Sequence, residues 1–197
     1  MAKTGSSLSR NEQKYRREGE RKVVDDQKKS AEAFSITREF EAPVDLLWKA
    51  HTEADRLAQW WGPKGFSMLS CKLDLTPGGL FHYGMRSPNG QDMWGRFVYR
   101  EIVAPKRLSF VVSFSDKDGG KTRHPWSVTW PVEVLNTMTL TERDGKTVLT
   151  VQGHPINATE DEIKTYEAGH ESMRQGFKGT LDQLDEYLAK ALAEAKS

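Results

Sequence analysis

Histidine is the side chain in this sequence best suited to metal binding or acid–base chemistry, because it changes charge near neutral pH and offers two ring nitrogens. The five histidines show no HExxH spacing, and the single cysteine, Cys71, has no CxxC partner. Neither a phosphate-binding GxGxxG or Walker pattern nor a Gly-x-Ser-x-Gly elbow occurs. The sequence therefore predicts no metal site and no cofactor.

Two residues remain as candidates for catalysis or for orienting a bound molecule. His170 stands in an apolar helical stripe between Tyr166 and Met173, where it would hydrogen-bond a ligand or act as a general base. The alternative is a histidine bonded to a backbone carbonyl or to water at a cavity edge. Tyr83 likewise offers a hydroxyl that either orients a ligand or lies in solvent.

A long amphipathic helix must position His170. Thr159, followed three residues later by Glu162, has the pattern of a capping box that starts a helix. Gly169 and Gly176 fall within the expected helix, where such small residues either leave room beside it or let a strand or ring approach closely. The apolar positions recur every three or four residues at Ile163, Tyr166, His170, Met173, Phe177, Leu181, Leu184, Leu188 and Leu192.

The middle of the chain is predicted to form strands. Segments of alternating or apolar character are separated by turn sequences such as Thr76–Gly79 and Ser87–Gly90, and short turns imply antiparallel neighbours. The segment from Phe34 to Phe40 alternates in the same way, and Pro43 then begins a region that predicts two short helices. The later strands are expected at 66–75, 80–86, 92–103, 108–114, 129–142 and 147–154.

These elements define an α+β fold in which a curved antiparallel sheet of about seven strands wraps around the C-terminal helix. Large rings on the inner strand faces pack at angles and enclose volume, so the sequence favours a cavity between sheet and helix. A core filled completely by the same rings is the alternative. Trp94 and Phe97 have opposite strand parity, so at most one of them is expected to point inward.

The N-terminal segment differs from the rest in composition. Residues 1–33 carry nine basic and six acidic side chains and few large apolar ones, which predicts a charged arm, either flexible or a lone helix. Contact between this arm and nucleic acid is the less favoured alternative. Residues 34–197 form the expected single domain. No apolar run is long enough for a membrane span, and the lone cysteine is typical of the cytoplasm.

Several motifs in order resemble a known family. They are Phe40-Glu41-Ala42-Pro43, Trp60-Trp61-Gly62-Pro63, Asp74–Gly79, Gly95-Arg96-Phe97 leading to Glu101–Leu108, and Gly176-Phe177 ahead of three leucines. Residues 34–190 are thereby similar to the START-like or SRPBCC superfamily, in the bacterial branch named for the C-terminal domain of the activator of the Hsp90 ATPase. Phe177 stands where the family more often has tryptophan.

This resemblance implies a helix-grip fold with a hydrophobic cavity, but it does not choose a function, because members bind small molecules, catalyse cyclase-like reactions or associate with chaperones in stress responses. Our leading hypothesis is non-catalytic binding of a small apolar or aromatic molecule. A cyclase- or aromatase-like enzyme using His170 or Tyr83, and a chaperone-associated interaction domain or homodimer, stay open. The residues expected to contact the ligand are Phe81, Tyr83, Met85, Phe110, Val112, Phe114, Trp126, His170, Met173 and Phe177.

Overall fold

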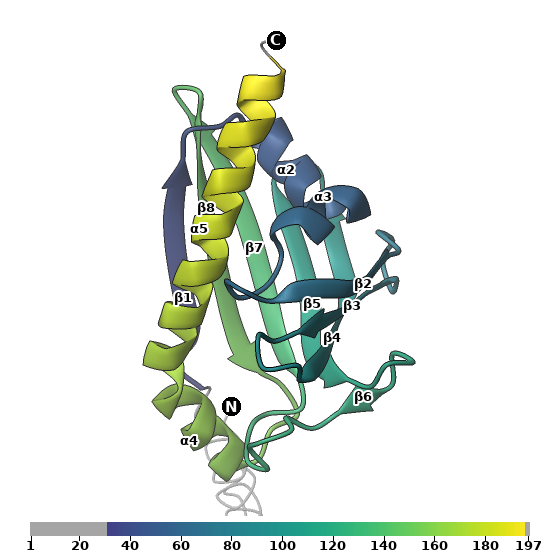
Figure 1. Cartoon of the computed structure of the whole chain (residues 1–197). Helices are drawn as coiled ribbons and strands as arrows, with labels where there is room; N and C mark the ends of the chain where they lie inside the picture. Colours follow the sequence, from purple (N-terminus) through teal and green to yellow (C-terminus); the bar gives the residue numbers. More distant parts are fainter. Residues whose placement is uncertain (1–30, 196–197) are drawn as a thin grey trace, which may run out of the picture. The chain divides into compact units, whose positions relative to one another are not determined.

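The computed structural model describes residues 31–195, which form an α+β domain (Figure 1). The helices are α2 (Val44–Thr52), α3 (Ala54–Trp60), α4 (Glu160–Ala168) and α5 (His170–Glu194). The strands are β1 (Phe34–Phe40), β2 (Ser67–Leu73), β3 (Leu80–Arg86), β4 (Asp92–Val103), β5 (Arg107–Ser115), β6 (Lys121–Thr122), β7 (Val134–Arg143) and β8 (Lys146–Pro155).

The strands of this part of the chain form one antiparallel sheet in the order β1-β8-β7-β5-β4-β3-β2, with β6 added beside β5. The sheet is curved, and α5 lies along its concave side, with α2 and α3 beside the C-terminal half of that helix (Figure 1). This arrangement is the helix-grip architecture, so the predicted fold class is confirmed.

Local sequence chemistry fixes the turns that give the sheet its register. β7 and β8 are joined at Asp144 and Gly145, whose φ angles of 54° and 77° both lie in the left-handed region. A two-residue hairpin with positive φ at both positions matches the twist of the flanking strands, and Asp-Gly is one of its preferred sequences. The pairing of Arg143 with Lys146 then sets which residues of β7 and β8 face α5.

The domain has a large core and a smaller satellite. Leu181, Leu184 and Leu188 of α5 are buried in the large cluster, together with apolar residues of α2, α3 and the sheet. Arg38 on β1 adds a polar connection, because its guanidinium pairs with the carboxylates of Asp182 and Asp185. The C-terminal half of α5 is thus the part that holds the helix to the sheet.

The satellite cluster lies at the other end of α5. It contains Phe34, Val134 and Tyr166, with Trp130 and Met173 packed against them. It therefore connects the start of β1, the start of β7, α4 and the first turns of α5.

The C-terminal helix differs from the single continuous helix that the periodicity predicts. It is divided at Gly169, which ends α4 and precedes α5. A β-carbon at Gly169 would lie 3.0 Å from the Trp130 ring and 3.3 Å from the Thr165 and Tyr166 carbonyl oxygens. The break therefore coincides with a close approach of an aromatic ring that another residue would hinder. The capping box at Thr159 and Glu162 is present as predicted.

Two strand boundaries also differ from expectation. β7 begins at Val134, five residues after the predicted start at Thr129, because residues 129–133 form an irregular segment in which the Trp130 N–H donates to the Ser127 carbonyl. The short β6 was not anticipated. A charged arm is predicted at residues 1–33, and residues 1–30 of that segment lie outside the described part of the chain. None of the helices in the described range is long and apolar enough to cross a membrane.

Candidate functional site

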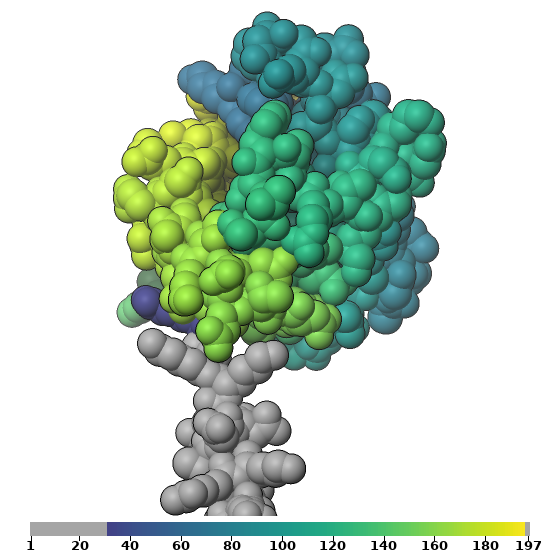
Figure 2. All heavy atoms as spheres, turned by 90° about the horizontal axis from the view of Figure 1, so that it is seen from below, coloured from purple at the N-terminus to yellow at the C-terminus, as the bar shows by residue number. Residues whose placement is uncertain are grey.

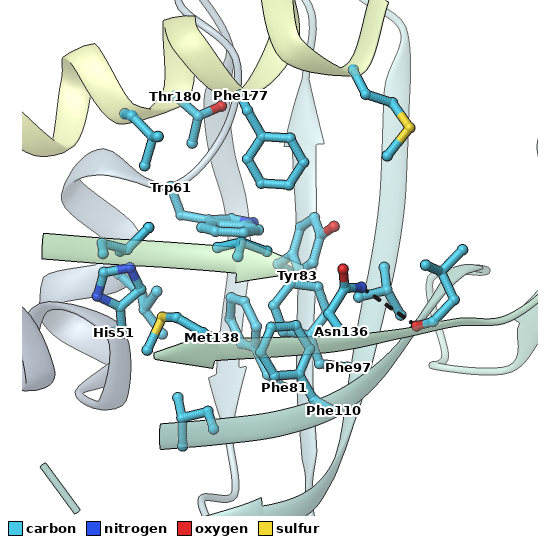
Figure 3. Close-up of a pocket in the computed structure, with 18 of the residues that line it drawn as sticks. His51, Trp61, Phe81, Tyr83, Phe97, Phe110, Asn136, Met138, Phe177 and Thr180 are labelled. Carbon is cyan, nitrogen blue, oxygen red and sulfur yellow. Dashed lines mark hydrogen bonds between the residues drawn. The ribbon is translucent and has the colours of Figure 1, made fainter. Parts of the chain in front are cut away.

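A cavity of about 290 Å³ lies between the concave face of the sheet and α5 (Figure 3). Its lining comes from α2 and α3, from β3, β4, β5, β7 and β8, and from α4 and α5. The sheet side chains that face it follow strand parity. Phe110, Val112 and Phe114 alternate along β5, while Val134, Asn136 and Met138 alternate along β7.

Aromatic rings form one wall of the cavity around Trp61. The Trp61 ring centroid lies 6.0 Å from Phe81, 5.8 Å from Tyr83 and 5.4 Å from Phe97, with the rings at steep angles. Such edge-to-face packing is favourable but leaves gaps between rings. Gly95 makes this wall possible, because it pairs with Tyr83 across β3 and β4 and the tyrosine ring occupies the place of a side chain there.

The Tyr83 hydroxyl belongs to the same wall. Burial raises its pKa to about 12, while a hydrogen bond with Trp61 acts in the opposite direction. The group is therefore a neutral hydrogen-bonding phenol near pH 7, and it is poorly suited to giving or taking a proton in a reaction at that pH.

His51 on α2 is a second polar group of the lining. Its Nδ1 lies 2.8 Å from the Leu47 carbonyl oxygen, which can only accept, so Nδ1–H is the donor and Nε2 carries the lone pair. Burial lowers the His51 pKa to about 4. Figure 3 shows the ring at the end of the cavity formed by α2. His51 thus presents a neutral imidazole to the interior.

Asn136 and Tyr166 are polar groups nearer the opposite end. The Asn136 Nδ2 donates to the Val134 carbonyl oxygen at 3.4 Å (Figure 3). The side-chain oxygen of Asn136 lies over Gly153, its partner across β7 and β8. Tyr166 is fully buried, at 0% exposed, and burial raises the pKa of its hydroxyl.

The end of the cavity near α4 is closed by the segment between β6 and β7. Arg123 donates to Glu162 Oε1 at 2.8 Å, and the Thr165 hydroxyl donates to that of Thr129 at 3.0 Å. Figure 2 views this end of the domain, where the teal-green segment around residue 120 lies against the lime α4. These contacts hold the Trp130 ring within 5.7 Å of Tyr166, where it lines the cavity.

Most of the residues predicted to contact a ligand do line this cavity, but three do not. Met85 is buried with its sulfur against Gly62, outside the lining. Trp126 is 67% exposed in the loop before β7. His170 packs between the rings of Phe34 and Tyr166 in the satellite cluster. The structure brings together Phe81, Tyr83, Phe110, Val112, Phe114, Met173 and Phe177.

Each of these three residues lies outside the cavity lining for a different physical reason. Trp126 belongs to an irregular segment in which strand parity has no meaning. The His170 ring packs against Phe34 of the edge strand β1 as well as Tyr166, so it is buried beside the cavity and not in its lining. Met85 has the correct parity but lies near the end of β3, where it meets the turn at Gly62. As predicted, only one of Trp94 and Phe97 points inward: Phe97 lines the cavity, while Trp94 stacks on His82.

Other lining residues were missed although the sequence holds signals for some of them. Asn136 occupies the inward parity of β7 between Val134 and Met138, so it is a polar residue in an apolar series. His51 follows Leu47 by one helical turn on the buried face of α2. Trp61 carries no such signal, since its direction depends on the extended backbone that follows α3.

The lining is suited to holding an uncharged molecule. No Asp, Glu, Lys or Arg is among the described residues that surround the cavity, and no cluster of three potential metal ligands occurs in residues 31–195. Placing an unpaired charge there would cost several kcal/mol, on the order of the penalty for a buried ion. The site offers apolar contact area with a few fixed hydrogen-bonding groups, which is the usual composition of a small-molecule pocket.

The architecture and this enclosed aromatic cavity define the class: the domain is a START-like helix-grip protein. The family model for "Activator of Hsp90 ATPase homolog 1-like protein" matches residues 41–189, so the chain belongs to that family. The resemblance drawn from the motifs is thereby confirmed. None of the curated protein sequences compared with the chain matches it significantly.

Solved structures of bacterial proteins share the fold. A Mycobacterium smegmatis protein is 28% identical with a TM-score of 0.64, and the match covers 79% of this chain and 90% of that one. A Nitrosomonas europaea protein is 26% identical with a TM-score of 0.64, covering 82% and 96%. The AHSA1 protein from Silicibacter pomeroyi is 20% identical with a TM-score of 0.62, covering 81% and 99%, and shows the fold alone.

Proposed function

We propose that this protein binds a small apolar or aromatic molecule in the cavity between the sheet and α5, without transforming it. The observation that supports the proposal is the cavity of about 290 Å³ with an almost wholly apolar, aromatic-rich lining. An apolar cavity of about 150 Å³ in another protein stays dry and takes up benzene, so a volume near twice that size suits a molecule of about two rings. Apolar burial would contribute roughly 25 cal/mol per Å².

The catalytic alternative receives less support from the positions of its residues. His170 lies outside the cavity lining, and the Tyr83 hydroxyl has a pKa raised to about 12 by burial. A proton shuttle needs a group that titrates near the working pH and reaches the substrate. Binding without catalysis requires no group that titrates near the working pH.

The interaction-domain alternative requires a large exposed apolar patch. Among the described residues, the exposed large hydrophobic side chains are Leu69 on β2, Val103 on β4, and Trp126 and Val128 in the loop before β7. Only the last two are neighbours in the chain, so the small-molecule proposal is the better supported one. We also propose that the protein acts in the cytoplasm. Cys71 is a free thiol, whereas proteins of oxidising compartments commonly contain disulfides.

The test uses naphthalene, a neutral two-ring probe, and protein carrying ¹³C-labelled methionine methyl groups. Met138 lines the cavity and Met68 does not, so addition of naphthalene should shift the NMR signal of the Met138 methyl and leave that of Met68 in place. Shifts at neither methyl, or equal shifts at both, would refute binding in this cavity.

A blocking variant makes the assignment specific. Met173→Trp places a larger ring in the lining from the first half of α5, and it should abolish the naphthalene-dependent shift. Gln175→Trp is the matched control, because Gln175 is exposed two positions further along the same helix. If Met173→Trp binds naphthalene as well as the control does, the molecule binds elsewhere.

A further inference from the structure

Two polar groups, one of them without a partner, lie close together in the lining of the otherwise apolar cavity. The Tyr166 hydroxyl has no hydrogen-bond partner among the described residues, although Tyr166 is fully buried. The Asn136 side-chain oxygen lies directly over Gly153, and the Tyr166 hydroxyl lies 3.1 Å from the point that a β-carbon of Gly153 would occupy. Both groups line the cavity. The Asn136 oxygen therefore occupies the place that a side chain at position 153 would take, and the Tyr166 hydroxyl lies beside it.

The Tyr166 hydroxyl needs a partner, because a buried donor or acceptor left unpaired is costly and most buried polar groups are paired. The Tyr166 hydroxyl can donate one hydrogen bond. The Asn136 oxygen can only accept, and its amide nitrogen already donates to Val134. The group that satisfies both must accept from Tyr166 and donate to Asn136. A hydroxyl does both with a single atom.

The remainder of the cavity restricts the rest of the molecule. The lining contains no charged side chain, and burial lowers the His51 pKa to about 4, so His51 is a neutral acceptor near pH 7. A charged ligand would find no counter-ion there. The aromatic wall around Trp61 offers ring faces and edges against which flat rings pack well.

We propose that the cavity selects a neutral aromatic molecule carrying a hydroxyl group, which binds between Asn136 and Tyr166 over Gly153. This inference rests on the proposed function and names the chemical class of its ligand. A water molecule held by the same two groups is the competing occupant, and it would give no preference for a hydroxyl-bearing ligand.

The experiment compares naphthalene with 2-naphthol, which differs from it by one hydroxyl and is neutral at pH 7. Dissociation constants come from the shift of the Met138 methyl signal in NMR titrations. Since a paired hydroxyl contributes about 1 kcal/mol and tenfold corresponds to about 1.4 kcal/mol, the native protein should bind 2-naphthol about fivefold more tightly, or somewhat less if bound water must be displaced.

Two variants test whether the preference for 2-naphthol over naphthalene arises at Tyr166 and Asn136. Tyr166→Phe removes only the unpartnered hydroxyl, so it should leave the binding of naphthalene unchanged and reduce the advantage of 2-naphthol severalfold. Gly153→Ala would place a β-carbon against the Asn136 oxygen, so it should displace that oxygen and have the same effect by a different route. Tyr187→Phe is the control, because its hydroxyl accepts from Arg56 on the surface away from the cavity, and it should retain the native preference. Thermal unfolding establishes that each variant is folded.

The outcomes separate the two proposals. If both probes bind at Met138 with equal affinity, the ligand hydroxyl does not pair with Asn136 and Tyr166, and this inference fails while the proposed function stands. If the preference for 2-naphthol survives Tyr166→Phe unchanged, the hydroxyl binds elsewhere and the assignment is wrong. Binding of neither probe would overturn both proposals.

Discussion

His51 should make the stability of the domain depend on pH in a narrow range. Its side chain is 9% exposed, and burial lowers its pKa from the ordinary 6.5 to about 4. Between these two values the unfolded chain binds a proton at this residue and the folded protein does not. Acidification from pH 6.5 to pH 4 therefore stabilises the unfolded state selectively, and stability is lost as the pH falls through this window.

The magnitude follows from the same two values. Each pH unit between them corresponds to about 1.4 kcal/mol, so the full effect has an upper limit of about 3 kcal/mol. Between pH 7 and pH 4.5 it amounts to about 2.5 kcal/mol, because the transition is not complete at either end. The carboxylates with lowered pKa, such as Asp182 beside Arg38 and Glu162 at the start of α4, respond at more acidic pH and do not imitate this loss.

The assay is urea unfolding at pH 7 and at pH 4.5 for the native protein and for His51→Gln. Glutamine cannot be protonated but can still donate to the Leu47 carbonyl. The native protein should lose about 2.5 kcal/mol more than the variant between the two pH values. His154→Gln, at an exposed position on β8, is the control and should follow the native protein. Equal losses in the native protein and His51→Gln would refute a buried neutral imidazole.

Three further predictions concern the elements that build the cavity. Leu184→Ala, at a fully buried position of α5, should lower the free energy of unfolding by about 2–5 kcal/mol in urea titrations. Thr159→Ala removes the acceptor of the Glu162 N–H and should cost about 1 kcal/mol by the same assay, whereas no change would mean that the capping box contributes nothing. Gly95→Ala should force the Tyr83 ring from its place, lowering the melting temperature and altering the near-ultraviolet circular dichroism; an unchanged aromatic spectrum would contradict this packing.

The features that could be predicted correctly from the sequence depend on residues that are close together in the chain. Strand parity correctly assigned Phe81 and Tyr83 of β3, and the alternate residues of β5, to the face that lines the cavity. The capping box correctly placed the start of α4. Each of these features depends on backbone periodicity or on a hydrogen bond between residues three positions apart, so the information lies within a few residues of the feature itself.

Features that depend on distant contacts were not predictable in the same way. The division of the C-terminal helix at Gly169 involves the Trp130 ring, which is brought there by a segment far away in the chain. The position of His170 outside the lining depends on Phe34 of β1, against which its ring packs. The proximity of the Asn136 oxygen and the Tyr166 hydroxyl at Gly153 needs the cross-strand register of β7 and β8 as well as the position of Tyr166 on α4. These contacts between distant residues exist only in the folded structure, so local sequence patterns do not predict them.

The two halves of α5 have different roles, and this explains how a cavity persists in a stable domain. Leu181, Leu184 and Leu188 are buried in the main core and hold the second half of the helix. Met173 and Phe177 in the first half are only partly buried and face the cavity. Since most of the burial energy is concentrated in the leucines, the first half can border empty volume at little cost in stability. Substitutions at Met173 and Phe177 should therefore change which molecule fits, while substitutions at the leucines should mainly lower the free energy of unfolding of the domain.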